Sequence, residues 1–210
     1  MDIINFLIEF VLHIDKHLGE IIKSYGTLTY LILFLIVFAE TGLVFTPFLP
    51  GDSLLFATGV FASLGSFNIF VLLGILMLAA IIGDTVNYWI GHFFGEKIVA
   101  NPRLPINQEH IDKTNRFFEK HGGKTIILAR FVPIVRTFAP FVAGAGQMNY
   151  GKFISFNIIG GIIWVLIFTL AGYFFGNIPF VKNNFSLVVI AIILISLIPI
   201  AIEVIKSRKK

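Results

Sequence analysis

The chain has 210 residues, of which 57% are hydrophobic and 13% are charged, and its formal net charge is +4. A soluble domain carries about 25% charged and about 45–50% apolar residues, so the composition excludes a soluble globular protein, a disordered chain and a nucleic-acid binder. The absence of cysteine excludes a disulfide framework and thiolate metal sites. We expect an integral membrane protein with one membrane domain over residues 1–210.

The N-terminal segment is acidic at its start, which disfavours a cleavable signal peptide because such a peptide begins with positive charge. Ile3 to Leu18 is apolar on one side and polar elsewhere. This pattern predicts an interfacial or short packing helix.

The next apolar segment is interrupted. Its two arms, Leu28–Ala39 and Leu54–Leu64, are both shorter than the ~20 residues of a spanning helix. Between them lie Pro47, Pro50 and Gly51, and proline blocks continuation of a helix. The segment therefore predicts a re-entrant hairpin, whose backbone at the break must face protein or a water-filled cavity.

A long apolar run and a polar stretch follow the first hairpin. Phe67–Phe94 predicts a spanning helix, and Glu96–Lys124 is polar. Within the polar stretch, Asn107–His121 repeats apolar residues at helical spacing. We expect an amphipathic surface helix there, with Asn107 as its N-cap and Gly122-Gly123 as its stop.

A second interrupted segment, Thr125–Met148, contains Pro133 and Pro140. It resembles the first in kind, and we expect a second re-entrant hairpin. Phe153–Phe175 and Phe185–Ile202 then predict two spanning helices. The first of these contains Gly160-Gly161, a pair that permits close approach of another backbone.

The distribution of basic residues predicts the topology. The polar stretch 96–124 and the tail 206–210 are rich in Lys and Arg, and both should be cytoplasmic by the positive-inside rule. One spanning helix separates the two hairpins, which then enter from opposite faces. The sequence thus predicts an all-α membrane protein with an inverted pair of hairpins, an arrangement found in transporters.

Five ionisable residues lie inside or beside the apolar segments. Each would cost about 2.5–3.5 kcal/mol at the centre of a spanning helix, so such residues usually face a cavity, pair with one another, or do both. Two interpretations stay open: a central polar cavity, or structural ion pairs between the hairpins. The five residues are Glu40, Asp52, Asp84, Arg130 and Arg136.

Residue chemistry gives these side chains different expected roles. Arg130 and Arg136 offer planar donor forks suited to a phosphate headgroup. Glu40 and Asp52 can carry coupling protons, since a carboxylate removed from water binds a proton more readily; Asp52, which follows Pro-Gly, is equally well read as a helix N-cap. Asp84 is interpreted as a supporting charge near water at a helix end, bonded to Asn87 or Tyr88.

Two motifs carry a resemblance to a known family. Residues 38–42 (FAETG) and 47–52 (PFLPGD) resemble the first signature of the DedA family, also described as SNARE-associated or VTT-domain proteins. Residues 117–124 (FFEKHGGK) lead into 129–144 (ARFVPIVRTFAPFVAG), which resembles the second signature. The resemblance covers about residues 20–180, and 185–210 would form a C-terminal helix and basic tail. Gly83-Asp84 and residues 157–164 also fit the family pattern.

The resemblance implies membrane helices with two opposed re-entrant hairpins in the cytoplasmic membrane. It implies a flippase for a lipid carrier, with undecaprenyl phosphate as the best candidate and phosphatidylethanolamine or another phospholipid as alternatives. It also implies dependence on the proton motive force. By motif, the family's important acidic residues fall on Glu40 and Asp52, and its essential arginines on Arg130 and Arg136.

Two other function classes share part of this residue pattern. A proton-coupled cation antiporter would use the same carboxylates, but two fixed positive charges oppose cation entry. An intramembrane enzyme needs a nucleophile with a base, or metal ligands. None of the five histidines lies in an interrupted segment, and we expect a transporter without metal or cofactor. The oligomeric state is not readable from the sequence. The histidines are His13, His17, His92, His110 and His121.

Overall fold

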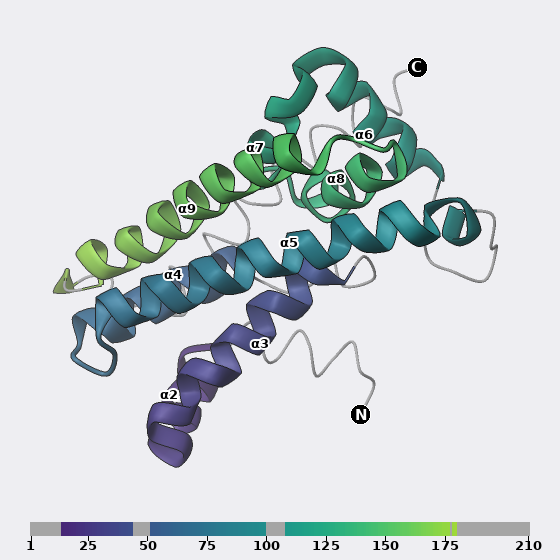
Figure 1. Cartoon of the computed structure of the whole chain (residues 1–210). Coiled ribbons are helices and arrows are strands. Elements are labelled where there is room, and N and C mark those ends of the chain that lie inside the picture. Colours follow the sequence, from purple (N-terminus) through teal and green to yellow (C-terminus); the bar gives the residue numbers. More distant parts are fainter. Residues whose placement is uncertain (1–13, 44–50, 100–107, 177, 180–210) are drawn as a thin grey trace. The chain divides into compact units, whose positions relative to one another are not determined.

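The computed structural model describes residues 14–43, 51–99, 108–176 and 178–179, and these residues form helices and turns without a strand (Figure 1). The all-α prediction is therefore confirmed for the described part of the chain. The predicted helix Phe185–Ile202, the basic tail and most of Ile3–Leu18 lie outside it. In chain order the elements are α2 (Ile14–Tyr25), η1 (Gly26–Leu28), α3 (Thr29–Gly42), α4 (Gly51–Ser63), α5 (Ile69–Val99), α6 (Gln108–His121), η2 (Gly122–Lys124), α7 (Thr125–Ala129), α8 (Pro133–Ala145) and α9 (Tyr150–Phe175).

Two predicted spanning helices are present as helices and are candidate membrane spans. Ile69–Gly95 of α5 and Tyr150–Phe175 of α9 are long and apolar enough to cross a membrane. Each begins after an asparagine that caps its first turn: Asn68 Oδ1 accepts from the Phe70 amide at 3.0 Å, and Asn149 Oδ1 from the Lys152 amide at 3.2 Å. Such caps satisfy amides that the first turn leaves without a partner.

The first interrupted segment differs from its prediction in length. Helical structure runs from Gly19 to Gly42, and these 24 residues are also long and apolar enough to span. The expectation of a short first arm was wrong because α2 and η1 extend it, through Gly26 in a left-handed conformation (φ +50°). The second arm was predicted at Leu54–Leu64, and α4 spans Gly51–Ser63, so it begins three residues earlier than expected. Pro47 and Pro50 lie outside the described residues.

The second interrupted segment is confirmed as two helices with a break. The short α7 ends at Ala129, and α8 begins at Pro133. Proline suits this first helical position because its missing N–H would have no intrahelical partner there. Pro140 lies inside α8. The break therefore places Arg130 between two helices rather than within one.

The amphipathic helix α6 also agrees with its prediction. It ends at His121, and Gly122 follows in a left-handed conformation with φ +58°. Glycine adopts this conformation without steric cost, which explains the helix stop. The predicted N-cap, Asn107, lies outside the described residues. On one face of α6, Phe117 and Phe118 pack against the buried residues of α8 and its neighbours.

The chain divides into two compact units. The described part of the first comprises residues 14–34, 51–76, 165–176 and 178–179, and that of the second comprises 35–43, 77–99 and 108–164. The helices α3, α5 and α9 each contribute to both. That the chain behaves as one membrane domain stays a prediction.

Glycines allow close backbone contacts between helices inside each unit. In the first unit, a Cβ on Gly59 of α4 would lie 2.0 Å from the Thr169 carbonyl oxygen of α9, and one on Gly172 would lie 2.0 Å from the Phe56 carbonyl oxygen. In the second unit, α8 and α5 make the same kind of contact. A Cβ on Gly144 would lie 2.0 Å from the Tyr88 carbonyl oxygen, and one on Gly91 would lie 2.1 Å from the Phe141 carbonyl oxygen.

The start of each interrupted segment repeats another contact. The Thr29 hydroxyl donates to the Ile21 carbonyl at 3.4 Å, and the Thr125 hydroxyl donates to the Phe117 carbonyl at 3.0 Å. Each threonine follows a short 3-10 turn that begins with a left-handed glycine. Contacts of the first unit thus have counterparts in the second, made by glycine and threonine in both.

Candidate functional site: a buried cluster of two arginines and two carboxylates

The second unit brings together four of the five ionisable residues singled out in the sequence. Glu40 comes from α3, Asp84 from α5, Arg130 from the turn after α7, and Arg136 from α8. All four are buried, with exposed fractions between 2% and 9%. The fifth, Asp52, belongs to the first unit, where it lies half-buried in the first turn of α4.

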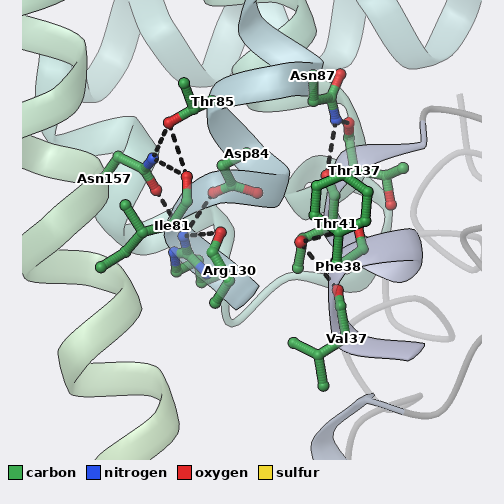
Figure 2. A network of polar contacts seen from close by, with 11 residues as sticks. Val37, Phe38, Thr41, Ile81, Asp84, Thr85, Asn87, Arg130, Thr137 and Asn157 are labelled. Atoms are coloured by element: carbon green, nitrogen blue, oxygen red, sulfur yellow. Dashed lines mark hydrogen bonds and ion pairs between the residues drawn. The ribbon is translucent and has the colours of Figure 1, made fainter. Parts of the chain in front are cut away.

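Arg130 is held by one of its terminal nitrogens. Its Nη2 lies 2.6 Å from Asp84 Oδ2 and donates to Asn157 Oδ1 at 2.6 Å (Figure 2). The same nitrogen lies 3.3 Å from the Ala80 carbonyl oxygen. Asn157 is itself fixed, because its Nδ2 donates to the Ile81 carbonyl at 3.0 Å. Arg130 is therefore anchored to both long helices of the unit, α5 and α9.

The other nitrogens of Arg130 are buried without an acceptor. Among the described residues, neither Nε nor Nη1 has a hydrogen-bond partner. A guanidinium carries five N–H donors, and those on Nε and Nη1 remain to be satisfied. Buried donors without acceptors are rare in native proteins and call for a ligand, a water or an ion. An anionic oxygen is the strongest acceptor that could occupy this position.

The glycine pair of α9 makes room for this arginine. A Cβ on Gly160 would lie 3.3 Å from both Cδ and Nε of Arg130, and one on Gly161 would lie 3.4 Å from Nη2. The Gly160 position also lies 3.2 Å from the Ile127 Cα of α7. The sequence prediction that Gly160-Gly161 admits a close backbone is thus confirmed, and the pair also receives the Arg130 side chain.

The sequence interpretation of Asp84 was wrong. We expected a charge near water at a helix end, bonded to Asn87 or Tyr88. Instead α5 continues to Val99, and Asp84 is 2% exposed and pairs with Arg130. The physical reason is that a carboxylate inside an apolar helix needs a cation, and the break after α7 supplies one.

The second ion pair joins α8 to α3. Nη2 of Arg136 lies 2.5 Å from Oε1 of Glu40. Arg136, with an exposed fraction of 9%, is the most exposed of the four charged residues. The pair joins the two interrupted segments at their polar positions. Removing either partner would leave an uncompensated buried charge, which is strongly destabilising.

Trp164 connects the two arginines. Its fully buried indole ring lies 5.7 Å from Cζ of Arg130 and 5.3 Å from Cζ of Arg136, measured to the ring centroid. Both distances fall within the range of cation–π attraction. One aromatic ring of α9 therefore attracts both guanidiniums of the cluster.

An amide positions the helices around this cluster. Nδ2 of Asn87 donates to the Thr41 carbonyl at 3.1 Å and to the Thr137 carbonyl at 2.9 Å (Figure 2). This side chain ties α5 to α3 and α8. A Cβ on Gly83 would lie 1.9 Å from Thr41 Oγ1, so glycine is needed where α3 crosses α5.

Sequence reasoning missed three of these residues as parts of the site. Asn87 entered only as a possible partner of Asp84, and Asn157 and Trp164 only as parts of a matching run. The available signal was a lone amide within each long apolar helix, since a polar side chain at such a position is expensive unless it has partners. No sequence signal identified Trp164, because an aromatic residue is common in a membrane helix.

The comparisons with known proteins agree on one family. Residues 49–174 match the VTT domain. The full chain is 57% identical to Protein DedA of Escherichia coli K12, over 97% of that protein. It is 45% identical over 78% of its length to an uncharacterized membrane protein of Mycobacterium leprae, covering 74% of that protein. It is 36% identical over 71% of its length to the inner membrane protein YqjA of Escherichia coli K12, covering 69% of that protein. No solved structure matches the chain.

Proposed function

Because the chain belongs to the DedA family of membrane proteins and carries a VTT domain over residues 49–174, we propose that it is a lipid translocase for a phosphate-headed lipid. The observation that carries this proposal is Arg130. Its Nε and Nη1 are buried without an acceptor among the described residues, and a second guanidinium, Arg136, faces the same tryptophan ring. The headgroup oxygens would accept from these donors.

The proposed fold is a pair of opposed re-entrant hairpins. The first is built around the break between α3 and α4, and the second around the break between α7 and α8. The repeated contacts of the two units support a common design. In this proposal α5, which is long enough to span, separates the two breaks, and the hairpins enter from opposite faces of the membrane. The basic residues of the tail support a cytoplasmic C-terminus by the positive-inside rule.

A phosphate fits the two arginines better than other common headgroups do. Guanidinium groups stay protonated and present planar donor forks that match phosphate oxygens. Inside a poorly hydrated site, such charge-assisted hydrogen bonds are stronger than in water. The hydrocarbon chains would stay in the bilayer while the headgroup alone enters the site. This division of roles confines the large desolvation cost to the headgroup.

Transport requires that protonation changes the affinity of the site for the lipid on one side of the membrane. If the protonated and the deprotonated site bound the lipid equally well, no net movement would follow. Glu40 forms the ion pair with Arg136, and its protonation would release that guanidinium for the headgroup. Asp52, in the first turn of α4, is the second proposed coupling carboxylate. Protons driven by the membrane potential and pH gradient would then bias the direction of movement.

Undecaprenyl phosphate is the first lipid to test. The choice follows the resemblance of the two motifs to DedA-family signatures, since family membership alone does not fix the substrate. The phosphate monoester of this carrier presents more acceptor oxygens than the phosphodiester of phosphatidylethanolamine. We therefore place phosphatidylethanolamine and other phospholipids second.

A proton-coupled cation antiporter is the second candidate. The observation that favours it is that both arginines lie in ion pairs, with Asp84 and Glu40. In that function the arginines would be structural counter-ions, and protonation of the carboxylates would drive exchange. The two candidates differ in one requirement, because only the translocase needs an anionic headgroup.

The test uses purified protein in liposomes that carry undecaprenyl phosphate in one leaflet, with and without a pH gradient. The matched negative lipid is the uncharged undecaprenol. The variant is Arg130→Gln with Arg136→Gln, and the matched control is Arg116→Gln, which removes an exposed arginine of α6. We expect movement of the phosphate lipid only, lost in the double variant and kept in the control. Movement of both lipids, or of neither by folded protein, would contradict the proposal.

A further inference from the structure

We propose that Asp84 is the carboxylate that the lipid headgroup displaces from Arg130, and that Asp84 takes up one proton as it does so. The inference rests on the proposed function and deepens it. It gives a coupling role to a residue that the sequence interpretation regarded as a supporting charge. It also predicts an uptake of one proton by the buried cluster for each monoanionic headgroup bound.

The geometry around Arg130 places the headgroup beside Asp84. Asp84 Oδ2 and Asn157 Oδ1 both lie 2.6 Å from Nη2, while Nε and Nη1 have no acceptor among the described residues. A headgroup oxygen on Nε or Nη1 would share one guanidinium with the Asp84 carboxylate. Two anions on the same group repel, and a proton on one of them removes the repulsion.

The count of charges gives the same result. The buried cluster contains Arg130 and Arg136 with Asp84 and Glu40, so it is neutral when all four are ionised. A headgroup with one negative charge would leave the cluster with a net charge in a poorly hydrated place. Uptake of one proton restores neutrality, which avoids the cost of an unpaired buried ion.

Asp84 is better placed than Glu40 for this role. Asp84 pairs with Arg130 itself, whereas Glu40 pairs with Arg136. The charged groups that face Asp84 are Arg130 from the turn after α7 and Arg136 from α8. Glu40 of α3 pairs with Arg136, and the neutral Asn157 of α9 accepts from Arg130. When Asp84 is neutral, Asn157 Oδ1 and the Ala80 carbonyl still accept from Arg130 and keep its side chain in position.

The step balances without any further reactant. A proton from water on the side of lipid entry forms an O–H bond on the Asp84 carboxylate. The ion pair between Asp84 and Arg130 is replaced by an ion pair between the headgroup and Arg130, and no covalent bond of the lipid changes. Release of the headgroup on the other side returns the proton to water and restores the first ion pair.

The sequence supplies a reporter for this step. The chain has two tryptophans, and one of them, Trp164, faces both guanidiniums. A Trp89→Phe background leaves Trp164 as the only indole, so its fluorescence reports on anion binding. The probe is dibutyl phosphate, a phosphodiester whose charge stays at minus one throughout the experiment. Any dependence of its affinity on pH therefore comes from the protein.

The measurement is the affinity for dibutyl phosphate as a function of pH, together with proton uptake in weakly buffered detergent solution. We expect the affinity to fall about tenfold for each unit of rising pH while Asp84 is ionised in the empty protein, since one bound proton is linked to one bound anion. Uptake should be one proton per probe. Asp84→Asn should remove both the slope and the uptake, and Asp84→Glu should restore them.

The control is Glu119→Gln, which removes an exposed carboxylate of α6 and should leave slope and uptake unchanged. A slope that survives in Asp84→Asn and disappears in Glu40→Gln would assign the proton to Glu40 and overturn the inference. If Asp84→Asn does not fold, absence of proton uptake in the Trp89→Phe protein still overturns it. Failure of the probe to bind at any pH refutes the headgroup site itself, which distinguishes failure of the proposed function from failure of this inference.

Discussion

The buried pair of Asp84 and Arg130 gives a quantitative prediction for stability. Removing one partner of a buried ion pair costs about 3–5 kcal/mol, because the remaining charge is unpaired. We expect Arg130→Met to fall in this range, since Asp84 Oδ2 would lose the cation 2.6 Å away. Asp84→Asn should cost about 2–3 kcal/mol, because Asn157 and the Ala80 carbonyl still accept from the guanidinium and each such charged hydrogen bond contributes about 1.5–3 kcal/mol.

The double variant, Arg130→Met with Asp84→Asn, separates the effect of the charges from the effect of side-chain packing. With both charges removed, no unpaired ion remains, and the free energy of unfolding should exceed the additive expectation by about 2 kcal/mol or more. The assay is reversible unfolding in mixed micelles with increasing denaturing detergent, followed by circular dichroism. Two results would refute the reasoning: free energies of unfolding of the single variants within about 1 kcal/mol of the native value, or losses that are strictly additive in the double variant. Both results are typical of exposed, hydrated ion pairs.

Three further predictions follow from the geometry. Gly144→Ala should lower the free energy of unfolding by at least about 2 kcal/mol relative to Gly74→Ala. The Cβ at position 144 would lie 2.0 Å from a carbonyl oxygen of α5, whereas the space around Gly74 is open. Equal thermal stability of the two variants would contradict this packing. Asn157→Ala should weaken dibutyl phosphate binding about tenfold to a hundredfold, because a charged hydrogen bond of about 1.5–3 kcal/mol that positions Arg130 is lost. Calorimetry measures this affinity, and an unchanged value would argue against the anchoring role. Trp164→Leu should weaken the same binding by about threefold to thirtyfold, as loss of one or two cation–π contacts of about 0.5–1 kcal/mol each implies, whereas an affinity that does not change would exclude a role for the ring.

Much of the helical organisation could be predicted from the sequence. The long apolar runs predict α5 and α9, because a membrane helix needs about 20 apolar residues. The prolines and glycines predict the breaks. Pro133 cannot continue α7 and begins α8, and Gly51 stands at the start of α4. The length of the first arm could not be predicted, because Gly26 usually ends a helix, and here the helical path resumes immediately after it.

The candidate site could be predicted in composition but only partly in its pairing. The high cost of intramembrane charge identifies Glu40, Arg130 and Arg136 from the sequence alone. Pairing depends on which helices lie together, and spacing along the chain does not show that α5 carries Asp84 to the break after α7. For the same reason Asn157 and Trp164 remained outside the predicted site, although they contact Arg130 from a distant helix.

The most direct test of the central claim measures whether the guanidiniums touch a lipid phosphate. Protein labelled with ¹⁵N at arginine is reconstituted with undecaprenyl phosphate, and ¹⁵N–³¹P dipolar couplings are recorded by solid-state NMR, with Arg130→Gln and Arg136→Gln assigning the signals. We predict couplings from both arginines that correspond to about 4 Å, as a hydrogen bond between guanidinium and phosphate requires. Couplings absent from both residues, in protein shown to be folded and loaded with lipid, would contradict the account.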